Sequence, residues 1–180
     1  NVWTEQAHLV EVWLEKDALS GIFENILRPY GVTLNVGRGY DGWDSIHNAA
    51  QRYLTWGADV TVLYFGDFDP SGEDMVRSLR DRLYFFETSP EIVKCALTAA
   101  DVTDYHLPPD FTKPTDTRRA AFVAKFGDVA VELDALPMDV LQARLESELQ
   151  ARLDLDALRL VYEQENADRA RLVAALSAAA

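Results

Sequence analysis

Residues 60–75 read V-T-V-L-Y-F-G-D-F-D-P-S-G-E-D-M, and the rest of the chain can be placed around them. Val60–Phe65 is a run of β-branched and aromatic residues, which predicts a buried strand. Asp67 and Asp69 follow it, and a proline and a glycine then turn the chain into a helix. Because one residue separates the two aspartates, their side chains leave an extended backbone on the same face. Neighbouring carboxylates suit a hard cation such as Mg²⁺, which substrate phosphates usually complete.

Length and composition indicate a globular protein. The chain has 180 residues, of which 48% are apolar and 11% aromatic, and this is enough for one domain with its own core. No apolar run reaches about 18 residues, so no membrane-spanning helix is expected. The single cysteine, Cys95, lies in an apolar run and is typical of a core residue in a reducing compartment. We therefore expect a soluble, cytoplasmic protein without a membrane partner.

The net charge of −13 at pH 7 bears on the choice of partner. A protein that binds nucleic acid through its own surface usually carries a basic patch, and this chain as a whole does not. Either the partner is not nucleic acid, or metal ions and a few local cations screen the phosphates, or other parts of an assembly hold the strand.

Strands and helices alternate over the first half of the chain. Besides the strand at 60–65, apolar runs predict strands at Leu9–Leu14, Val32–Val36 and Glu91–Leu97, with a brief one at Val129–Leu133. Helical spacing of apolar residues predicts a helix after each of the first three strands. This alternation predicts an α/β, Rossmann-like fold: a mainly parallel sheet of four to five strands, flanked by helices.

The second half of the chain is different. A proline-containing loop at 106–117 precedes a short predicted helix at 118–126, and the pattern near the C-terminus is helical. We therefore divide the chain into an α/β domain at residues 1–136 and a C-terminal helical extension at residues 137–180, packed on it.

Three carboxylates are predicted to share one edge of the sheet. In open α/β sheets, ligands bind at the carboxyl ends of the strands. Glu15 ends the first predicted strand, and Asp67 and Asp69 end the third. Glu73 and Asp74 begin the next helix, where they are either outer ligands or simply favourable charges at a helix N-terminus.

An apolar strand that ends in Glu15, with Asp67-Phe68-Asp69-Pro70-Ser71-Gly72 later in the chain, resembles the Toprim domain. This metal-binding module is shared by topoisomerases, bacterial-type primases and related nucleases. The version in this chain is most similar to that of topoisomerase VI A subunit-like proteins. The likeness covers about residues 8 to 150. Further matching segments are Arg38-Gly39-Tyr40, Ala96-Leu97-Thr98, Leu107-Pro108, Thr115-Asp116-Thr117-Arg118 and Val131-Glu132-Leu133-Asp134-Ala135-Leu136.

The resemblance implies Mg²⁺-dependent chemistry on DNA phosphodiester bonds, with Mn²⁺ as a substitute. Carried over by residue, Asp67 and Asp69 hold the metal, and Glu15 either holds a metal too or acts as general acid and base. Ions at such a site neutralise phosphate charge, stabilise the leaving oxygen and can supply an activated water.

Topoisomerases of this type cut DNA with a tyrosine on a separate helix-turn-helix domain, and the sequence before Glu15 is too short to hold one. Hydrolysis by a metal-activated water, as in a nuclease or nicking enzyme, is then the simpler reaction. Two alternatives stay open. The chain is part of a topoisomerase-like assembly whose DNA-binding or tyrosine-bearing domain is elsewhere, or it is a non-catalytic, metal-binding interaction module.

Several cations are candidates for phosphate contacts if nucleic acid binds, and for each the alternative is an ordinary solvated charge. They are Lys16, Arg38, Lys113, Arg118 and Arg119. Glu132 and Asp134 also need an interpretation. Either they approach the acidic site from a later element, or Asp134 caps the turn that follows it.

Haloacid-dehalogenase-like phosphatases are a rival class, because they also place Asp-x-Asp on a strand tip and use the first aspartate as nucleophile. They normally carry the pair on the first strand, with Thr or Val two residues on. In this chain the pair lies on the third predicted strand and is followed by Pro70-Ser71-Gly72. The sequence therefore favours the Toprim interpretation.

Overall fold

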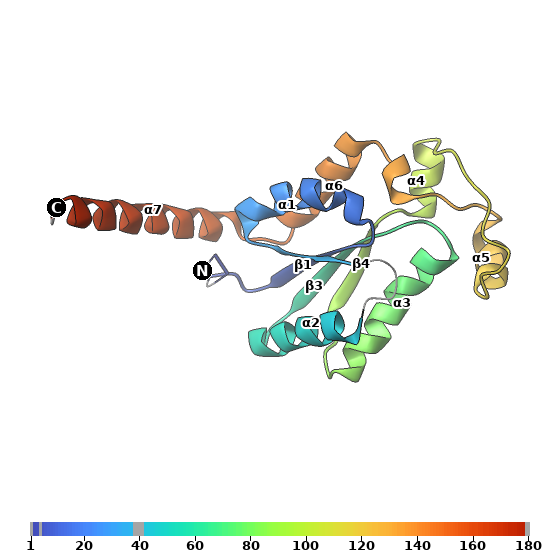
Figure 1. The fold of residues 1–180 in the computed structure, drawn as a ribbon, viewed down its shortest axis with the longest axis horizontal. Coiled ribbons are helices and arrows are strands. Elements are labelled where there is room, and N and C mark those ends of the chain that lie inside the picture. Colours follow the sequence, from blue (N-terminus) through green and yellow to red (C-terminus); the bar gives the residue numbers. More distant parts are fainter. Residues whose placement is uncertain (1, 4, 38–41, 179–180) are drawn as a thin grey trace.

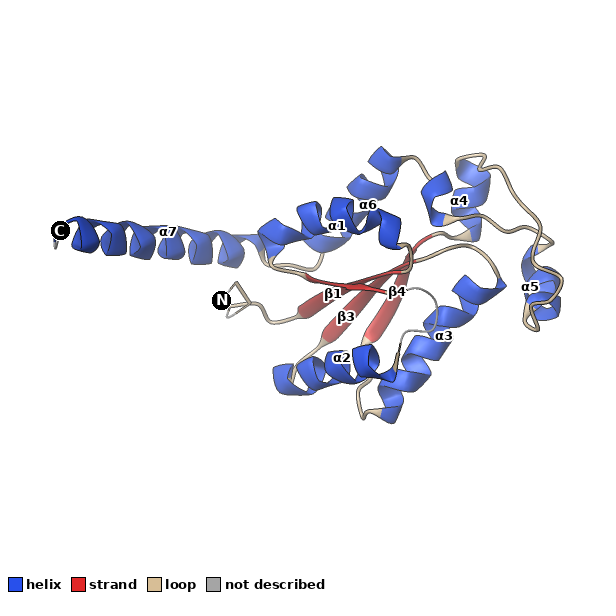
Figure 2. Cartoon of the chain, viewed as in Figure 1, coloured by secondary structure: helices blue, strands red, loops and turns tan. Residues whose placement is uncertain are grey.

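The computed structural model describes residues 2–3, 5–37 and 42–178, and it shows helices on both faces of a parallel sheet (Figure 1, Figure 2). Within the described residues the sheet has four strands in the order β2-β1-β3-β4. In chain order they are β1 Leu9–Leu14, β2 Thr33–Val36, β3 Val60–Phe65 and β4 Glu91–Ala96. The α-helices are α1 Ser20–Leu27, α2 Trp43–Trp56, α3 Pro70–Phe85, α4 Ala99–Asp104, α5 Arg119–Phe126, α6 Met138–Gln150 and α7 Leu155–Ala178. The predicted α/β fold is confirmed.

Short 3₁₀ turns connect some of these elements. They lie at Asp17–Leu19, Arg28–Tyr30 and Leu133–Ala135. The last of them follows Val131, which pairs with Phe68 just after the end of β3.

The register of the central strands brings their carboxyl ends to one level. Leu14, the last residue of β1, lies opposite Val36 of β2 and Phe65 of β3. The ladder continues one residue further, because the backbone N–H of Glu15 donates to the carbonyl of Phe65 at 2.9 Å. Side chains that follow β1 and β3 are therefore neighbours.

Alternation along the strands divides the core between two faces. On one face, Val10, Val12 and Leu14 pack with α1 and α6. On the other face, Trp13 and Tyr64 pack with α2 and α3. Figure 1 shows these two helix pairs on opposite sides of the sheet. Apolar residues on both faces of a strand are expected in a parallel sheet covered on both sides.

The predicted strand at Val129–Leu133 is wrong in its extent. The structure has two isolated antiparallel bridges in this region, Asp110 with Ala130 and Phe68 with Val131. Each bridge is a single residue pair, so the segment does not form a strand of the sheet. The 3₁₀ turn that begins at Leu133 then ends the extended stretch.

The predicted C-terminal extension has two parts that differ in burial. Leu141, Leu145 and Leu149 of α6 are fully buried and belong to the same core as β1 and β3. In α7, Leu158 is buried, whereas Leu172 is 66% exposed, and Figure 1 shows this helix projecting from the rest of the chain. In the described ranges, no helix combines the length and apolar character needed to cross a membrane.

Candidate metal centre

Glu15 and Asp67 lie in contact at the carboxyl edge of the sheet. They follow neighbouring parallel strands, β1 and β3, which end at the same level. The backbone N–H of Asp67 donates to Oε2 of Glu15 at 3.1 Å. The sequence correctly placed these two residues on one rim.

Phe68, which separates the two aspartates, faces the interior. Its side chain is 3% exposed and packs against the ring of Phe122, with centroids 5.2 Å apart. Its backbone N–H and C=O exchange hydrogen bonds with Val131, each at 2.9 Å. Asp67 and Asp69 are half-buried, and both line a cleft at the surface. Side chains therefore alternate along this turn: Phe68 points into the core, and Asp67 and Asp69 point to the cleft.

Each of the three carboxylates is held through one oxygen. Oδ1 of Asp67 accepts from the backbone N–H of Leu133 at 2.7 Å. Oδ1 of Asp69 accepts from the N–H of Gly72 at 2.6 Å and so caps the N-terminus of α3. Oε2 of Glu15 accepts from Asp67 and from a second donor. No donor within the described residues contacts the other oxygen of any of them, so each carboxylate keeps one oxygen without a protein donor.

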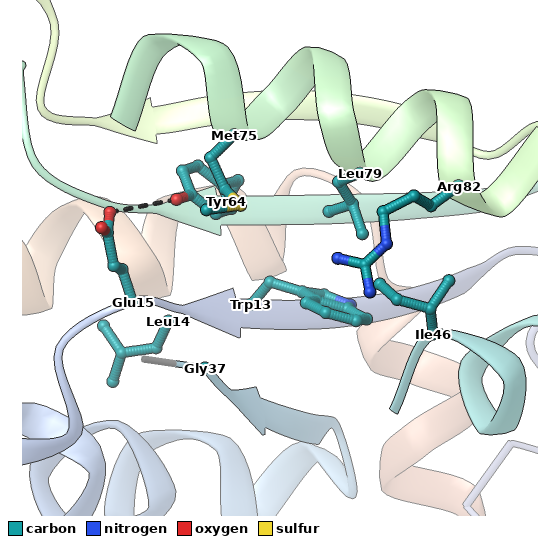
Figure 3. Close-up of a pocket in the computed structure, with 9 residues that line it drawn as sticks. All are labelled: Trp13, Leu14, Glu15, Gly37, Ile46, Tyr64, Met75, Leu79 and Arg82. Atoms are coloured by element: carbon teal, nitrogen blue, oxygen red, sulfur yellow. Dashed lines mark hydrogen bonds between the residues drawn. The ribbon is translucent and has the colours of Figure 1, made fainter. Parts of the chain in front are cut away.

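The second donor to Glu15 is the hydroxyl of Tyr64, which lies 3.1 Å from Oε2 (Figure 3). Tyr64 is 3% exposed, and burial raises the pKa of its hydroxyl, with the charge of Glu15 adding to the effect. The hydroxyl therefore stays protonated and acts as a hydrogen-bond donor. Sequence reasoning had not assigned this tyrosine to the site.

Two glycines make room for these contacts. A Cβ on Gly66 would lie 2.5 Å from Oε2 of Glu15 and 2.6 Å from the hydroxyl of Tyr64. A Cβ on Gly72 would lie 2.2 Å from the carbonyl oxygen of Asp67. Both positions exclude a side chain because another group passes close to the backbone, which is a common use of glycine.

The carboxylates lie in an environment that disfavours their negative charge. Burial raises the pKa of Glu15 above its ordinary value, and the charge of Asp67 raises it further. Burial also raises the pKa of Asp67, the amide of Leu133 opposes this, and the charge of Asp69 adds to the rise. Like charges held together in a partly dry site are relieved by a proton or by a cation.

The cleft lined by Asp67 and Asp69 has a volume of about 390 Å³. Its other walls come from residues 108–116 and 130–135. Clefts of roughly this size bind small molecules or single units of a larger ligand. Glu15 borders a different, much smaller cavity of about 20 Å³ under α2 and α3 (Figure 3).

The donor set fits a hard cation in its chemistry. Carboxylate oxygens are the ligands that Mg²⁺ prefers, and this ion usually takes one or two protein carboxylates together with water and substrate phosphates. Asp67 and Asp69 supply two carboxylates to the cleft. The described part of the chain contains no group of three His, Cys, Asp or Glu side chains placed to hold a metal ion by themselves. Two protein carboxylates leave the other positions around such an ion to water or phosphate oxygens.

The two candidates for outer ligands are engaged in ion pairs. Glu73 pairs with Lys94, whose Nζ lies 2.5 Å from Oε1. The same lysine donates to the backbone carbonyl of Asp67 at 3.0 Å, so Glu73 is linked to the site through Lys94. Asp74 pairs with Arg77 at 2.7 Å and with Arg118 at 3.6 Å.

Most of the predicted phosphate contacts are occupied by carboxylates. Lys16 pairs with Glu132 at 2.7 Å and with Asp134 at 2.6 Å. This places both acidic residues beside the site and gives them a common partner, the first of the two interpretations left open. Arg118 lies 2.8 Å from Asp116.

The remaining cations differ from one another. Arg119 pairs with Asp128 at 2.6 Å. Lys113 lines the cleft, and it makes no ion pair with any described residue. Arg38, with the matched segment Arg38-Gly39-Tyr40, lies outside the described residues. Lys113 is therefore the described candidate best placed to meet a phosphate in the cleft.

Four groups of the site were missed in the sequence: the Tyr64 hydroxyl, Gly66, Lys94 and the amide of Leu133. Tyr64 and Gly66 lie inside the motif, and strand alternation already puts Tyr64 on the same face as Trp13. The contacts of Lys94 and Leu133 depend on tertiary pairing and have no local signal.

No protein-family model matches the chain, and no curated protein matches it.

Proposed function

We propose that this chain is a Toprim-type enzyme that hydrolyses phosphodiester bonds in DNA with the help of Mg²⁺. The observation that carries the proposal is the meeting of Glu15, Asp67 and Asp69 at the carboxyl edge of a parallel sheet. Each is held through one oxygen and leaves the other for a ligand. The fold and the resemblance of the motif to Toprim domains support the same assignment.

The residues have different tasks in this proposal. Asp67 and Asp69 face the cleft and would hold the ion, assisted by the substrate phosphate. When bound, Mg²⁺ neutralises phosphate charge, stabilises the leaving oxygen and activates water for attack on phosphorus. Glu15 accepts from the backbone N–H of Asp67 and adds negative charge beside it. Its raised pKa suits exchange of a proton at Oε1 during the reaction.

Hydrolysis is favoured over a covalent protein–DNA intermediate by the environment of Tyr64. Among the described residues, it is the tyrosine that contacts one of the three carboxylates, and it is buried with a raised pKa. A tyrosine nucleophile must reach the phosphorus and lose its proton. Tyr64 is suited to neither.

The test is cleavage of supercoiled plasmid and of single-stranded DNA by the pure chain in Mg²⁺, Mn²⁺ or EDTA. Asp67→Asn and Glu15→Gln are the informative variants, because each keeps an oxygen that accepts the hydrogen bonds of the fold. Glu24→Gln, an exposed change on α1, is the control. We expect cleavage that depends on the metal, is lost in both site variants and is kept in the control.

Two other results would overturn the proposal. Binding of Mn²⁺ without cleavage under any condition would exclude hydrolysis by this chain and favour an assembly in which a partner supplies the tyrosine. Release of phosphate from a small monoester, dependent on Asp67, would favour the phosphatase class instead.

A further inference from the structure

We propose that Tyr64 is a positioning residue that fixes the direction of the Glu15 carboxylate, so that Oε1 is the oxygen that serves the site. This inference rests on the proposed function, because it assigns a role to a contact of the same acidic cluster. It also separates two oxygens that are chemically equal in a freely rotating glutamate.

Both donors to Glu15 act on the same oxygen. The hydroxyl of Tyr64 and the backbone N–H of Asp67 each lie 3.1 Å from Oε2. Both belong to β3 or to the turn that follows it, whereas Glu15 follows β1. The neighbouring strand therefore sets the rotation of this side chain, and Oε1 is left without a donor among the described residues.

The tyrosine that donates to Glu15 is itself held rigidly. Its ring is 3% exposed and belongs to the core formed with α2 and α3. The cavity beside it, bordered by Glu15, Met75 and Leu79, has a volume of about 20 Å³ (Figure 3). Such a cavity holds about one water molecule, so it leaves little space for either side chain to change rotamer.

Gly66 shows that the chain leaves a path for this hydrogen bond. A Cβ at position 66 would lie 2.5 Å from Oε2 of Glu15 and 2.6 Å from the hydroxyl of Tyr64. The two groups therefore meet directly over the backbone of Gly66. Any larger residue would displace the carboxylate or the hydroxyl.

A second tyrosine–glutamate pair, between Tyr53 of α2 and Glu11 of β1, has different surroundings and supplies a matched comparison. The hydroxyl of Tyr53 donates to Oε2 of Glu11 at 3.0 Å. Arg52 contacts both oxygens of Glu11, at 2.6 and 2.8 Å, so this carboxylate is neutralised within the fold. Glu15 has no ion pair with a described residue, which leaves its charge for an added cation.

The experiment measures Mn²⁺ affinity by calorimetry, and the melting temperature of each protein. It compares the wild-type chain with Tyr64→Phe and with the control Tyr53→Phe. It also compares Glu15→Gln with the double variant Glu15→Gln/Tyr64→Phe. Groups that orient a metal site usually change metal affinity by about 10- to 100-fold. We expect Tyr64→Phe to weaken Mn²⁺ binding about tenfold and Tyr53→Phe to leave it unchanged. In the Glu15→Gln background, removal of the Tyr64 hydroxyl should have no further effect.

The outcomes separate this inference from the function on which it rests. Equal affinity in the wild type and Tyr64→Phe would overturn the positioning role while leaving the metal site intact. An equal loss in both Glu15 backgrounds would also overturn it, because the hydroxyl would then act on the fold generally. A wild-type chain that binds no Mn²⁺, either alone or with a short single-stranded oligonucleotide to supply phosphates, would overturn the proposed function and this inference with it.

Discussion

The backbone N–H of Leu133 donates to Oδ1 of Asp67 at 2.7 Å, a contact between residues 66 positions apart in the sequence. Together with the bridge between Phe68 and Val131, it holds residues 130–135 against the turn after β3. The sheet edge supplies the carboxylates, and this later segment supplies a wall of the cleft that they line. The site therefore depends on long-range pairing as well as on the motif.

Phe68 is expected to be the main anchor of this arrangement. Its side chain is 3% exposed and contacts the rings of Phe122 and Phe126, both at 5.2 Å. Phe68→Ala should lower the free energy of unfolding by about 3–5 kcal/mol, because it removes a buried ring and leaves a cavity. Urea denaturation measures this change.

The control for that experiment is Tyr84→Ala. Tyr84 is 73% exposed near the end of α3, so its loss should change stability by no more than about 0.5 kcal/mol. Similar values for the two variants would contradict an anchoring role for Phe68.

Asp67→Asn is expected to stabilise the metal-free protein at neutral pH. Asparagine keeps an oxygen that accepts from Leu133, and it removes a half-buried charge that repels Asp69 and Glu15. We expect the melting temperature in EDTA to rise by roughly 2 °C, the size of shift that a gain of under 1 kcal/mol gives in a domain of this length.

Added Mg²⁺ should reverse the order of stability. On the proposed function, we expect the wild-type chain to gain stability from the ion in proportion to the logarithm of its concentration, and Asp67→Asn to gain little. Asp104→Asn, an exposed change at the end of α4, is the control and should behave as the wild type. A lower melting temperature for Asp67→Asn in EDTA would show that charge repulsion is not the dominant effect.

The raised pKa values of Glu15 and Asp67 predict how stability depends on pH. A carboxyl group with a raised pKa binds a proton more readily in the folded state than in the unfolded state, so its contribution to stability grows as the pH falls. The growth begins as the pH passes the raised folded values. It is complete once the pH is below the ordinary values of 4.5 for Glu15 and 3.8 for Asp67.

Urea denaturation in EDTA at several pH values tests this sign. The advantage of Asp67→Asn over the wild type should be largest near pH 7 and should shrink as the pH is lowered. Comparing the two chains at each pH cancels the contributions of other titrating groups. One of these is Asp101, where burial would raise the pKa but hydrogen bonds from Arg144 lower it overall. An advantage that grows in acid would contradict the assignment.

Much of the fold and the acidic edge follow from local patterns in the sequence. Apolar runs predicted β1, β3 and β4 to within one residue. Because Glu15 follows β1 and Asp67 follows β3, the sequence also correctly predicted that these two residues are neighbours. The cleft could not be predicted this way. Val131 reads as part of a strand, yet it pairs only with Phe68, because its partner is a turn and not a strand.

The charge pattern was the hardest part to interpret from sequence. Lys16 and Arg118 look like phosphate ligands because they lie near the motif or in a basic group. In the fold, the distant Glu132 pairs with Lys16, and Arg118 pairs with the nearby Asp116 and also with the distant Asp74. Such pairings depend on which loops meet at the sheet edge, and composition alone does not reveal them.

Lys113 remains as a cation of the cleft, so its removal should weaken DNA binding. It lines the cleft together with Asp67 and Asp69, and no described residue forms an ion pair with it. A lysine that contacts one phosphate releases about one counterion, and its loss should reduce the dependence of log affinity on log salt by about one. We expect Lys113→Ala to bind a short single-stranded oligonucleotide several-fold more weakly at low salt.

Fluorescence anisotropy across a salt series, with Ca²⁺ in place of Mg²⁺ as the oxygen-seeking ion, measures both quantities. Lys125→Ala is the matched control, since Lys125 is an exposed lysine on α5 that lies over the ring of Phe126 at 4.7 Å. The same salt dependence in Lys113→Ala as in the wild type would mean that the phosphates follow another path. The chain carries a net charge of −13, and Lys113 has no ion pair with a described residue. If Lys113 contacts a phosphate, its removal should therefore change the slope of log affinity against log salt.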